Sequence, residues 1–514
     1  MKNIDEVWIV DFGSQYTQLI TRRLRELGYY SEIITVEDCL KVIQESRPLA
    51  LILSGGPQSV FDDKTDYSSF FTDPSLPVLG ICYGMQLIGQ YFGGTVVKGI
   101  SGEYGKAHIV KKKHSELKDK YDVWMSHSDH LENPGSELEV IFESKNEYIA
   151  AVKHINKPIM ALQFHPEVHH TENGDDFFNY FFDSIAKVDK NLEFSSLLEH
   201  CRVYLKSFEN AKVLCAFSGG VDSLVAAQMA YEIYGESLYC FFVDHGLVRY
   251  QDNHHIELLQ KNLDFKIEVV EAKDYFFEKL QGVSDPEQKR KIIGKSFIDI
   301  FEKKVKEYQE SHNIEFTHLL QGTLYPDVIE SISPFKGKGK SVTIKSHHNV
   351  GGLPERMKLK LIEPLNKLFK DEVRQIGSLL KLKDEWLYRH PFPGPGIGVR
   401  VLGELTGDRV RKVKESDQIL YEELVSQNLY NKTWQAFTVC IPQKTVGVKG
   451  DGRAYEEIIA LRLVDSVDGM TANFSQLPYS FFEKVASRIT NEVSGITRVV
   501  LDITNKPPGT IEWE

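Results

Sequence analysis

The chain has 514 residues, of which 42% are hydrophobic and 26% charged, and this composition is typical of a soluble globular protein of about three domains. Its formal net charge of -12 argues against a nucleic-acid partner, because nucleic-acid-binding proteins are usually basic. No apolar run approaches the roughly 20 residues that span a bilayer, and the N-terminus resembles a strand rather than a signal peptide. We therefore expect a cytoplasmic protein with no membrane partner.

The first 188 residues alternate short apolar runs with helical segments. Such alternation indicates an α/β domain with a parallel sheet. The expected strands are Val7–Val10, Leu49–Leu53, Val78–Ile81 and Ile159–Phe164, and Gln15–Leu27 is the clearest expected helix, ended by Gly28.

A charged helical segment near residues 187–210 leads to a second α/β pattern, which we assign to residues 189–389. It contains the expected strands Lys212–Phe217, Leu238–Val243 and Phe316–Leu320, and the expected helix Leu224–Tyr234. The lysine- and glycine-rich stretch 336–340 is predicted to be a loop.

The composition changes at His390, where HPFPGPGIG is too rich in proline and glycine for a helix or a central strand. We place a boundary there and predict a smaller α+β domain over residues 390–514, with helices near 408–425 and 479–492 and a strand near 499–503. The predicted fold is thus two successive parallel-sheet α/β domains followed by an α+β domain.

The first chemical pattern is PVLGICYGMQLIG, a strand followed by Gly-x-Cys-x-Gly and a helix. Gly80 and Gly84 permit a tight turn that exposes Cys82 at the start of the helix. The positive end of a helix favours the thiolate, which is the nucleophilic form, and the backbone N–H groups that follow can stabilise an oxyanion. Cys82 is therefore the candidate nucleophile.

A second pattern, QFHPE, supplies the base that a cysteine nucleophile needs. In an extended chain, residues two apart face the same way, so His165 can accept the thiol proton while Glu167 orients the imidazole. Gly55 and Gly56 in SGGP end another strand and offer N–H groups for an oxyanion. A core cysteine and two surface turns would explain each pattern singly, but their joint occurrence at strand ends favours catalysis.

GICYGMQ, QFHPE and SGGP resemble the class I glutamine amidotransferases over roughly residues 5–185. The resemblance implies that Cys82 is the nucleophile, His165 the base and Glu167 its partner. It also implies a glutamine and oxyanion pocket formed by Gly55, Gly56, Tyr83, Gln86, Ser126, His127 and Asp129.

The third pattern, SGGVDS, lies between a buried strand and a helix. Glycines and free N–H groups at a helix start bind phosphate oxygens. The candidate ATP-binding residues are Ser218, Gly219, Gly220, Val221, Asp222 and Ser223. Asp222 would contact phosphate through Mg²⁺, the predicted metal. The lysine of a Walker A loop is absent, and a simple serine-glycine turn is the alternative explanation.

SGGVDS resembles the PP-loop of the ATP pyrophosphatases, which transfer AMP to a substrate oxygen and release pyrophosphate. The resemblance implies that adenine contacts the backbone at Val243 and the side chain of Leu247 or Val248, and that the LQGTLYPD segment lines the ATP cleft. His245 is expected to be a solvent-facing loop residue.

KSHHNVGGLP, HPFPGPGIGVR, GVKGDGRAYE and the C-terminal TRVVLDITNKPPGTIEWE together resemble the GMP synthase family over nearly the whole chain. The resemblance implies a ligase that takes nitrogen from glutamine and, with ATP as co-substrate, aminates XMP. It also implies a homodimer. Arg498 and Lys506 would hold the XMP phosphate, Ile511 and Glu512 its ribose or base, and Lys345 would close over the intermediate with His347 and His348.

Two alternatives remain at this point. One is another PP-loop amidotransferase that acts on a different carbonyl acceptor, although the chain lacks an initial Met-Cys and a nitrilase pattern. The other is a non-catalytic sensor of adenine nucleotides, which the intact Cys82, His165, Glu167 and SGGVDS set disfavours.

Overall fold

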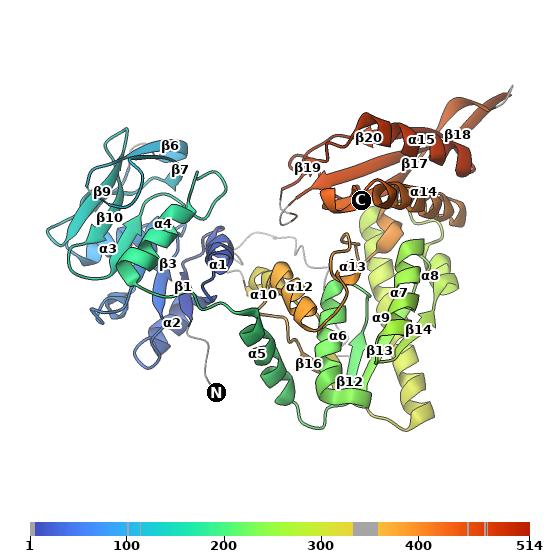
Figure 1. Cartoon of the computed structure of the whole chain (residues 1–514), viewed down its shortest axis with the longest axis horizontal. Helices are drawn as coiled ribbons and strands as arrows, with labels where there is room; N and C mark the ends of the chain where they lie inside the picture. Colours follow the sequence, from blue (N-terminus) through green and yellow to red (C-terminus); the bar gives the residue numbers. More distant parts are fainter. Residues whose placement is uncertain are drawn as a thin grey trace. The chain divides into compact units, whose positions relative to one another are not determined.

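The computed structural model describes residues 6–99, 102–113, 115–332, 358–449, 452–466, 469 and 471–514. The predicted loop 336–340 and the segment containing Lys345, His347 and His348 lie outside these residues. The chain forms two compact units, one built on the residues up to Leu197 and the other on residues 198–327 with the described residues from 358 onward (Figure 1).

A nine-stranded sheet forms the centre of the first unit. Its strands, in spatial order, are β2 (Ser31–Thr35), β1 (Val7–Asp11), β3 (Ala50–Leu53), β4 (Val78–Ile81), β11 (Ile159–Leu162), β10 (Ile149–His154), β9 (Leu138–Ser144), β6 (Glu103–Lys111) and β7 (Lys120–His127). The strands from β2 to β11 run parallel, whereas each pair from β11 to β7 is antiparallel. The predicted parallel sheet is therefore the half that carries the chemical patterns, and the antiparallel half extends it.

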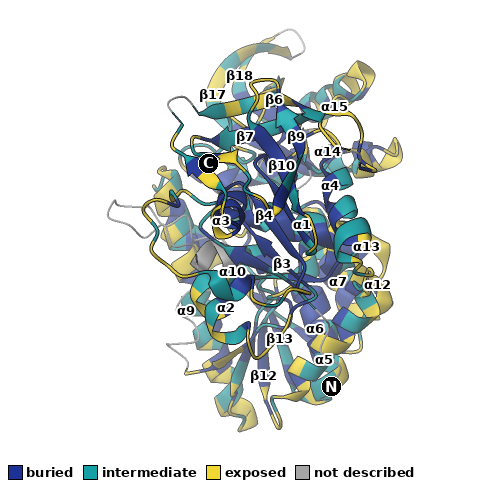
Figure 2. Cartoon of the chain, turned by 90° about the vertical axis from the view of Figure 1, so that its left-hand side faces the viewer, coloured by how far each residue is buried: buried dark blue, intermediate teal, exposed yellow. Residues whose placement is uncertain are grey.

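Helices cover this sheet and create a core on each face. They are α1 (Thr17–Glu26), α2 (Val36–Val42), α3 (Tyr83–Tyr91) and α4 (Asp175–Asn179), which continues as the π-helix Tyr180–Ala186, and a short 3₁₀ turn spans Ser68–Phe70. The two remaining strands, β5 (Thr95–Val97) and β8 (His130–Asn133), pair with each other. Central strands such as β3, β4 and β11 are buried along their whole length (Figure 2), which explains their continuous apolar sequences.

The second unit contains a five-stranded sheet that is entirely parallel. Its order is β14 (Ile267–Glu271), β13 (Leu238–Asp244), β12 (Val213–Ala216), β15 (His318–Leu320) and β16 (Lys360–Ile362). The helices are α5 (Phe194–Lys206), α6 (Val221–Tyr234), α7 (Tyr250–Asn262), α8 (Lys273–Leu280), α9 (Pro286–His312), α10 (Tyr325–Ile332), α12 (Lys370–Leu379) and α13 (Asp384–Leu387), with a 3₁₀ turn at Gly235–Ser237. The predicted second α/β domain is thus present.

The C-terminal part of this unit has a second, mostly antiparallel sheet. β18 (Gly452–Asp465) pairs with β17 (Gln435–Lys449), β19 (Asn473–Phe474) and β20 (Ile496–Asp502). It is accompanied by the helices α14 (Gly407–Ser426) and α15 (Tyr479–Glu492) and the 3₁₀ turns Gly396–Val399 and Tyr430–Lys432. The predicted fold class is confirmed.

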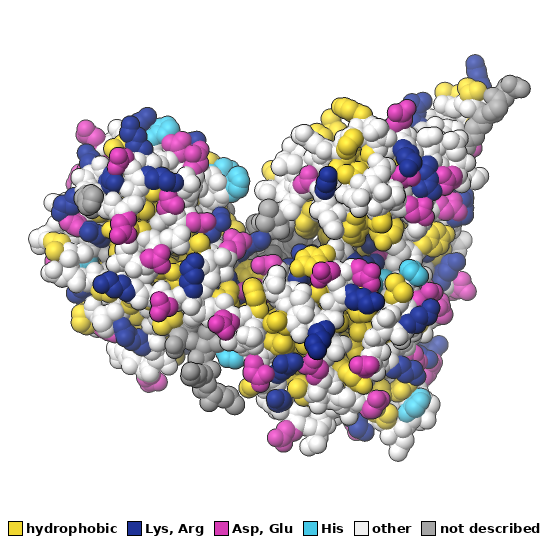
Figure 3. Space-filling view, in the orientation of Figure 1, with side chains coloured by type: hydrophobic (Ala, Val, Ile, Leu, Met, Phe, Trp, Pro, Cys, Tyr) yellow, Lys and Arg dark blue, Asp and Glu magenta, His cyan; other side chains and the backbone are white. Residues whose placement is uncertain are grey.

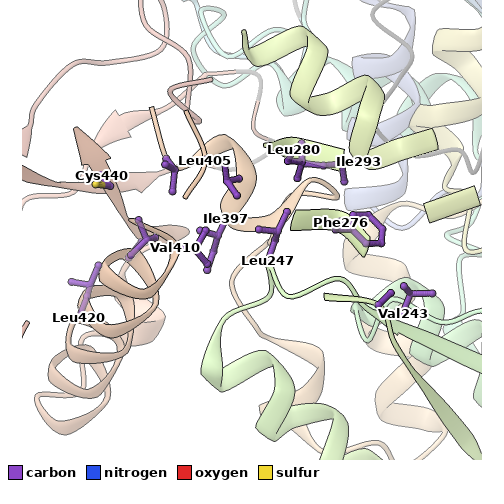
Figure 4. Close-up of a cluster of buried hydrophobic side chains, with 14 of the residues drawn as sticks. Val243, Leu247, Phe276, Leu280, Ile293, Ile397, Leu405, Val410, Leu420 and Cys440 are labelled. Carbon is purple, nitrogen blue, oxygen red and sulfur yellow. The ribbon is translucent and has the colours of Figure 1, made fainter. Parts of the chain in front are cut away.

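One hydrophobic cluster connects the two sheets of the second unit. Figure 4 shows Val243 and Leu247 at the end of β13, Ile397 from the proline- and glycine-rich segment, and Val410 and Leu420 of α14 in this cluster. The predicted boundary near residue 390 therefore coincides with a change of sheet, while apolar packing is continuous across it. The domain limits at 188/189 and 389/390 stay predictions.

Candidate active sites

Cys82 occupies a strained turn between β4 and α3. Its φ of 52° lies in the left-handed region, which non-glycine residues rarely adopt and which costs on the order of 1–3 kcal/mol. Close backbone packing requires glycine on either side: a Cβ at Gly84 would lie 2.4 Å from the carbonyl oxygen of Leu53, and a Cβ at Gly80 would lie 2.5 Å from that of Gly84. The predicted elbow is present, with Cys82 as the residue immediately before the helix.

His165 and Glu167 lie beside this cysteine, as the sequence predicts. The Nδ1 atom of His165 is 2.7 Å from Oε1 of Glu167, and both side chains are buried. A Cβ on Gly55 would lie 3.2 Å from Cε1 of His165 and 3.6 Å from Cβ of Cys82, so the three patterns meet at one point. The amide nitrogen of Gln163, a residue of the QFHPE pattern with no predicted role, lies 3.8 Å from Sγ of Cys82.

The electrostatic environment of His165 favours its protonated form. Burial alone would lower the pKa of this imidazole, but the charge of Glu167 and the hydrogen bonds to Cys82 and Glu167 outweigh it and raise the pKa well above 6.5. Because Glu167 binds Nδ1, Nε2 is left for proton exchange with a thiol or a leaving group. The arrangement suits a thiolate–imidazolium pair.

The predicted glutamine-binding residues surround Cys82. Gln86 donates through Nε2 to the carbonyl oxygen of Asp129 at 2.9 Å, and Nδ1 of His127 is 3.1 Å from the same oxygen. The carbonyl oxygen of Ser126 lies 3.8 Å from Sγ of Cys82. Thus the loop after β7 is fastened to the first turn of α3.

Tyr83 and Gly56 fix the walls of this site. The Tyr83 hydroxyl donates to Asp63 Oδ2 at 2.8 Å, and the side chain is buried in the domain. Its backbone is the first residue of α3. A Cβ on Gly56 would lie 2.7 Å from the carbonyl oxygen of Phe12, which leaves no room for a larger residue there.

The SGGVDS loop has the geometry of a phosphate cradle. Gly219 has a φ of 74°, and Gly220 is the N-cap of α6, which begins at Val221 rather than at Leu224 as predicted. The hydroxyls of Ser218 and Ser223 are 3.0 Å apart, and Ser218 also accepts from the N–H of Gly220 at 3.3 Å. Free N–H groups at the first turn of a 14-residue helix therefore adjoin a serine pair.

Asp222 is the anionic residue of this cradle. Its Oδ2 atom lies 2.6 Å from Nζ of Lys370, the first residue of α12, while Oδ1 is buried with no hydrogen-bond partner in the described parts of the chain. An unsatisfied carboxylate oxygen beside a phosphate cradle fits an oxygen-seeking cation such as Mg²⁺. Gly322 of the LQGTLYPD segment also adjoins Asp222, since a Cβ there would lie 3.0 Å away. Lys370 is not among the predicted residues, because a lone lysine at a helix start carries no signal in the sequence.

The residues predicted to contact adenine are more buried than expected. Val243 lies at the end of β13, and Leu247 is fully buried in the cluster of Figure 4, where its carbonyl oxygen accepts from the N–H of Ile397 at 2.8 Å. His245, expected to face solvent, is 7% exposed and packs against Phe276, and burial lowers its pKa to about 4. The segment 390–400 packs over the loop that carries His245 and Leu247 and buries both residues. The contact with adenine stays a prediction.

Three of the predicted XMP residues, Lys506, Ile511 and Glu512, already form hydrogen bonds within the protein. Arg400, which is fully buried, holds the carboxylate of Glu512 through Nε at 3.1 Å and Nη2 at 2.9 Å. Gln435 donates to the same carboxylate at 3.1 Å. Ile511 accepts through its carbonyl oxygen from Arg462, and Lys506 donates to the carbonyl oxygen of Gly469 at 2.7 Å.

Arg498 and Lys506 are far apart in one chain. Arg498 is exposed on β20 opposite Ile458, whereas Lys506 pairs with Ala472, next to the point where β19 meets Asp465. The stretch of β18 from 458 to 465 spans roughly 23 Å at about 3.3 Å per residue. Their side chains therefore do not reach one phosphate of the same chain, because the extended strand β20 separates them along the sheet.

A cavity among the described residues lies next to the phosphate cradle. It has a volume of about 1180 Å³ and lies between α7, α13, α14 and the turn at Tyr430, with Arg249, His255, Arg389 and Trp386 among its lining residues. It contains none of the predicted site residues. His255 connects it to the phosphate cradle, since its Nε2 atom is 3.2 Å from the carbonyl oxygen of Gly219.

Comparison with known proteins finds two family models that match parts of the chain. Residues 8–185 match the glutamine amidotransferase class-I family, and residues 422–513 match the GMP synthase C-terminal domain. The glutamine-hydrolysing GMP synthases of Aquifex aeolicus and Helicobacter pylori are 47% and 49% identical to the chain, each over 99% of it and over 99% and 100% of the relative. The chain belongs to the GMP synthase family.

Among solved structures, a GMP synthase subunit of Thermoplasma acidophilum is 30% identical over 36% of this chain and 96% of its own, with a TM-score of 0.34. Within the described parts of this GMP synthase family member, no helix is long and apolar enough to cross a membrane. No group of three or more His, Cys, Asp or Glu side chains in the same parts forms a metal site.

Proposed function

We propose that the chain converts XMP to GMP by using ATP and the amide nitrogen of glutamine, with the residues described above in named roles. The balanced reaction is ATP, XMP, glutamine and water to AMP, pyrophosphate, GMP and glutamate. The observation that carries the proposal is the convergence of Cys82, His165, Glu167 and Gly55 on one strained turn, in a chain that matches GMP synthases along its full length.

In the first half-reaction the Cys82 thiolate attacks the side-chain amide of glutamine. The tetrahedral oxyanion accepts hydrogen bonds from N–H groups at Gly55, Gly56 or Tyr83, which adjoin Cys82. His165, held by Glu167, gives its proton to the departing ammonia and then activates the water that releases glutamate.

In the second half-reaction ATP lies on the Ser218–Ser223 loop, whose N–H and hydroxyl groups bind phosphate. Asp222 would hold Mg²⁺, which neutralises phosphate charge when bound, and Lys370 is placed to exchange its bond to Asp222 for one to a phosphate oxygen. The acceptor oxygen of XMP attacks the α-phosphate, pyrophosphate leaves, and ammonia then displaces AMP from the purine.

XMP binding is assigned to the C-terminal segment. Lys506 is the phosphate ligand, since its bond to a backbone carbonyl is easily exchanged for a charge-assisted one. Ile511 and Glu512 contact the ribose or base, and Lys345 acts over the adduct. Arg498 stays a predicted XMP residue, although it lies too far from Lys506 of the same chain for both to hold one phosphate.

The chain is proposed to act as a homodimer through its C-terminal domain. The β17–β18 ribbon exposes Val446, Val448 and Tyr455, which are 49%, 77% and 60% accessible, and Figure 3 shows hydrophobic side chains near its outer end. Sedimentation equilibrium of wild type and Val448→Asp tests this: a dimer that the substitution weakens supports the proposal, and a wild-type monomer contradicts it.

We place the protein in the cytoplasm, where buried free cysteines such as Cys39 and Cys201 persist, and cell fractionation tests this location.

The decisive experiment is a product assay with ATP, Mg²⁺ and XMP, supplied with glutamine or with ammonium. GMP, AMP and pyrophosphate are expected from both nitrogen sources. ADP and phosphate, or no amination from either source, would instead favour another carbonyl acceptor or a different use of ATP. Replacing Mg²⁺ by EDTA is expected to stop AMP formation while glutamine hydrolysis continues.

A further inference from the structure

The last residues of the chain follow β20 without regular secondary structure, yet buried cations hold several of them. Arg462, on β18, is fully buried and donates to the carbonyl oxygens of Thr504, Thr510 and Ile511 at 2.5, 2.9 and 3.3 Å. Arg400 holds Glu512 with two hydrogen bonds. The segment 503–514, called the tail below, is thus fixed from the sheet side and from the segment that follows residue 390.

A third buried cation comes from the ATP-binding half. Lys289, near the start of α9, has a fully buried side chain whose Nζ atom lies 2.5 Å from Oε2 of Glu514 and 2.6 Å from the carbonyl oxygen of Val401. The other carboxylate oxygen of Glu514 accepts from the N–H of Gly403 at 3.0 Å. Arg290, the next residue of α9, contacts the backbone carbonyl of Glu514.

The side chains of the tail alternate. Glu512 and Glu514 face the buried cations Arg400 and Lys289, whereas Ile511 and Trp513 pack against the cluster around Phe437. A chain held on alternate sides has its register fixed, since a slip by one residue would place a carboxylate against apolar side chains. The bond to Glu514 therefore fixes the position of Glu512, two residues earlier.

We propose that Lys289 and Glu514 form a latch that positions the tail for XMP, so that Lys289 is a positioning residue supplied by the ATP-binding half to the XMP site. The latch ties α9, which packs on the ATP-binding sheet, to the segment that carries Lys506, Ile511 and Glu512. This inference rests on the proposed role of the tail in XMP binding. The latch thus joins the ATP-binding site and the XMP-binding site by one rigid connection.

The test separates positioning from mere stability. Removing one charge of a buried pair leaves the other unpaired and destabilises the protein, whereas removing both is close to neutral. Glu514→Gln, Lys289→Met and the double variant are compared by melting temperature, by calorimetric XMP affinity, and by KM for XMP and for ATP. The matched control is Lys412→Met with Glu457→Gln, a pair whose side chains are each 8% exposed and which joins α14 to β18 without touching the tail.

The expected result is that both single variants and the double variant weaken XMP binding by about 10- to 100-fold while KM for ATP stays within about twofold. The double variant is expected to regain the melting temperature but not the affinity, and the control pair to leave the affinity unchanged. Full recovery of XMP affinity in the double variant, or an equal rise in both KM values, would overturn the latch. If Lys289→Met does not fold, Glu514→Gln decides, since Lys289 then keeps its bond to Val401.

Hydrogen exchange supplies a readout that does not depend on the substrate. Amides of residues 503–514 are expected to exchange faster in the latch variants than in wild type, with α9 unchanged, and unaltered exchange of the tail would contradict the proposal. A wild-type protein that binds no XMP, together with faster exchange in the variants, would instead locate the error in the proposed function.

Discussion

Functional side chains are positioned in different ways at the glutaminase site and in the XMP-binding segment. In the first, the residues lie at the ends of adjacent parallel strands, β3, β4 and β11, so the sheet itself brings Gly55, Cys82 and His165 together. In the second, an irregular tail is held by three buried cations, Lys289, Arg400 and Arg462, that come from distant parts of the chain. A site built on strand ends is local and rigid, whereas the tail depends on long-range ion pairs.

The largest expected effect concerns the nucleophile. Cys82→Ala should reduce glutamine-dependent GMP formation by a factor on the order of 10⁴ or more, because no other group replaces the thiolate, while ammonium-dependent formation stays intact. Cys39→Ala, which removes a fully buried thiol of α2 outside the site, is the matched control and should retain both activities. Loss of the ammonium reaction in Cys82→Ala would contradict the separation of the two halves.

The next effect concerns the orienting carboxylate. Glu167→Gln should lower glutamine hydrolysis by about 10²- to 10⁴-fold, because the amide no longer stabilises the imidazolium. Without Glu167, only the contact with Cys82 opposes the effect of burial, and the pKa of His165 should fall relative to wild type. A pH–rate profile that stays unshifted in the variant would contradict this assignment.

The same substitution changes how stability depends on pH. In wild type the raised pKa of His165 stabilises the fold fully below the unfolded value of 6.5, and this contribution is lost as pH rises through the folded pKa. In Glu167→Gln this contribution is smaller, because the carboxylate that raises the pKa of His165 is gone. The difference between the two melting temperatures should therefore widen on acidification, and a constant difference from pH 8 to pH 5.5 would be the contrary result.

The third prediction concerns the phosphate cradle. Asp222→Asn should reduce AMP formation by about 10²- to 10³-fold and raise the Mg²⁺ concentration needed for half-maximal rate, because a charged ligand is lost. Glutamine hydrolysis without nucleotide should not change. The control, Asp384→Asn at the first turn of α13, alters a carboxylate outside the cradle and should leave the Mg²⁺ requirement as it is.

Communication between the two sites is the fourth prediction. Since free ammonia would be lost to water or protonated, glutamine hydrolysis should rise when ATP and XMP are bound, by about tenfold or more. Steady-state glutamate release with and without both nucleotides measures this effect. Equal rates in the two conditions would show that the sites work independently.

The smallest effect concerns packing of the elbow. Gly84→Ala places a Cβ 2.4 Å from a backbone oxygen of β3 and should destabilise the protein by about 1–3 kcal/mol. Gly294→Ala, in the interior of α9 with nothing within 4 Å of its new Cβ, should instead stabilise it by about 0.5–1 kcal/mol. Denaturant unfolding followed by circular dichroism compares them, and similar values for both would remove the steric argument.

The sequence by itself determined the parallel sheets, the elbow at Cys82, the HPE pair and the SGGVDS cradle, because each follows from a short segment whose period and turn residues fix its local shape. Leu49–Leu53 and Val78–Ile81 were placed within a residue of β3 and β4 for this reason. Only the tertiary structure decided which distant charges meet. Lys289 with Glu514, Arg400 with Glu512 and Lys370 with Asp222 are 225, 112 and 148 residues apart. A lone lysine or arginine has no periodic signature in the sequence, so its partner becomes visible only in the folded chain.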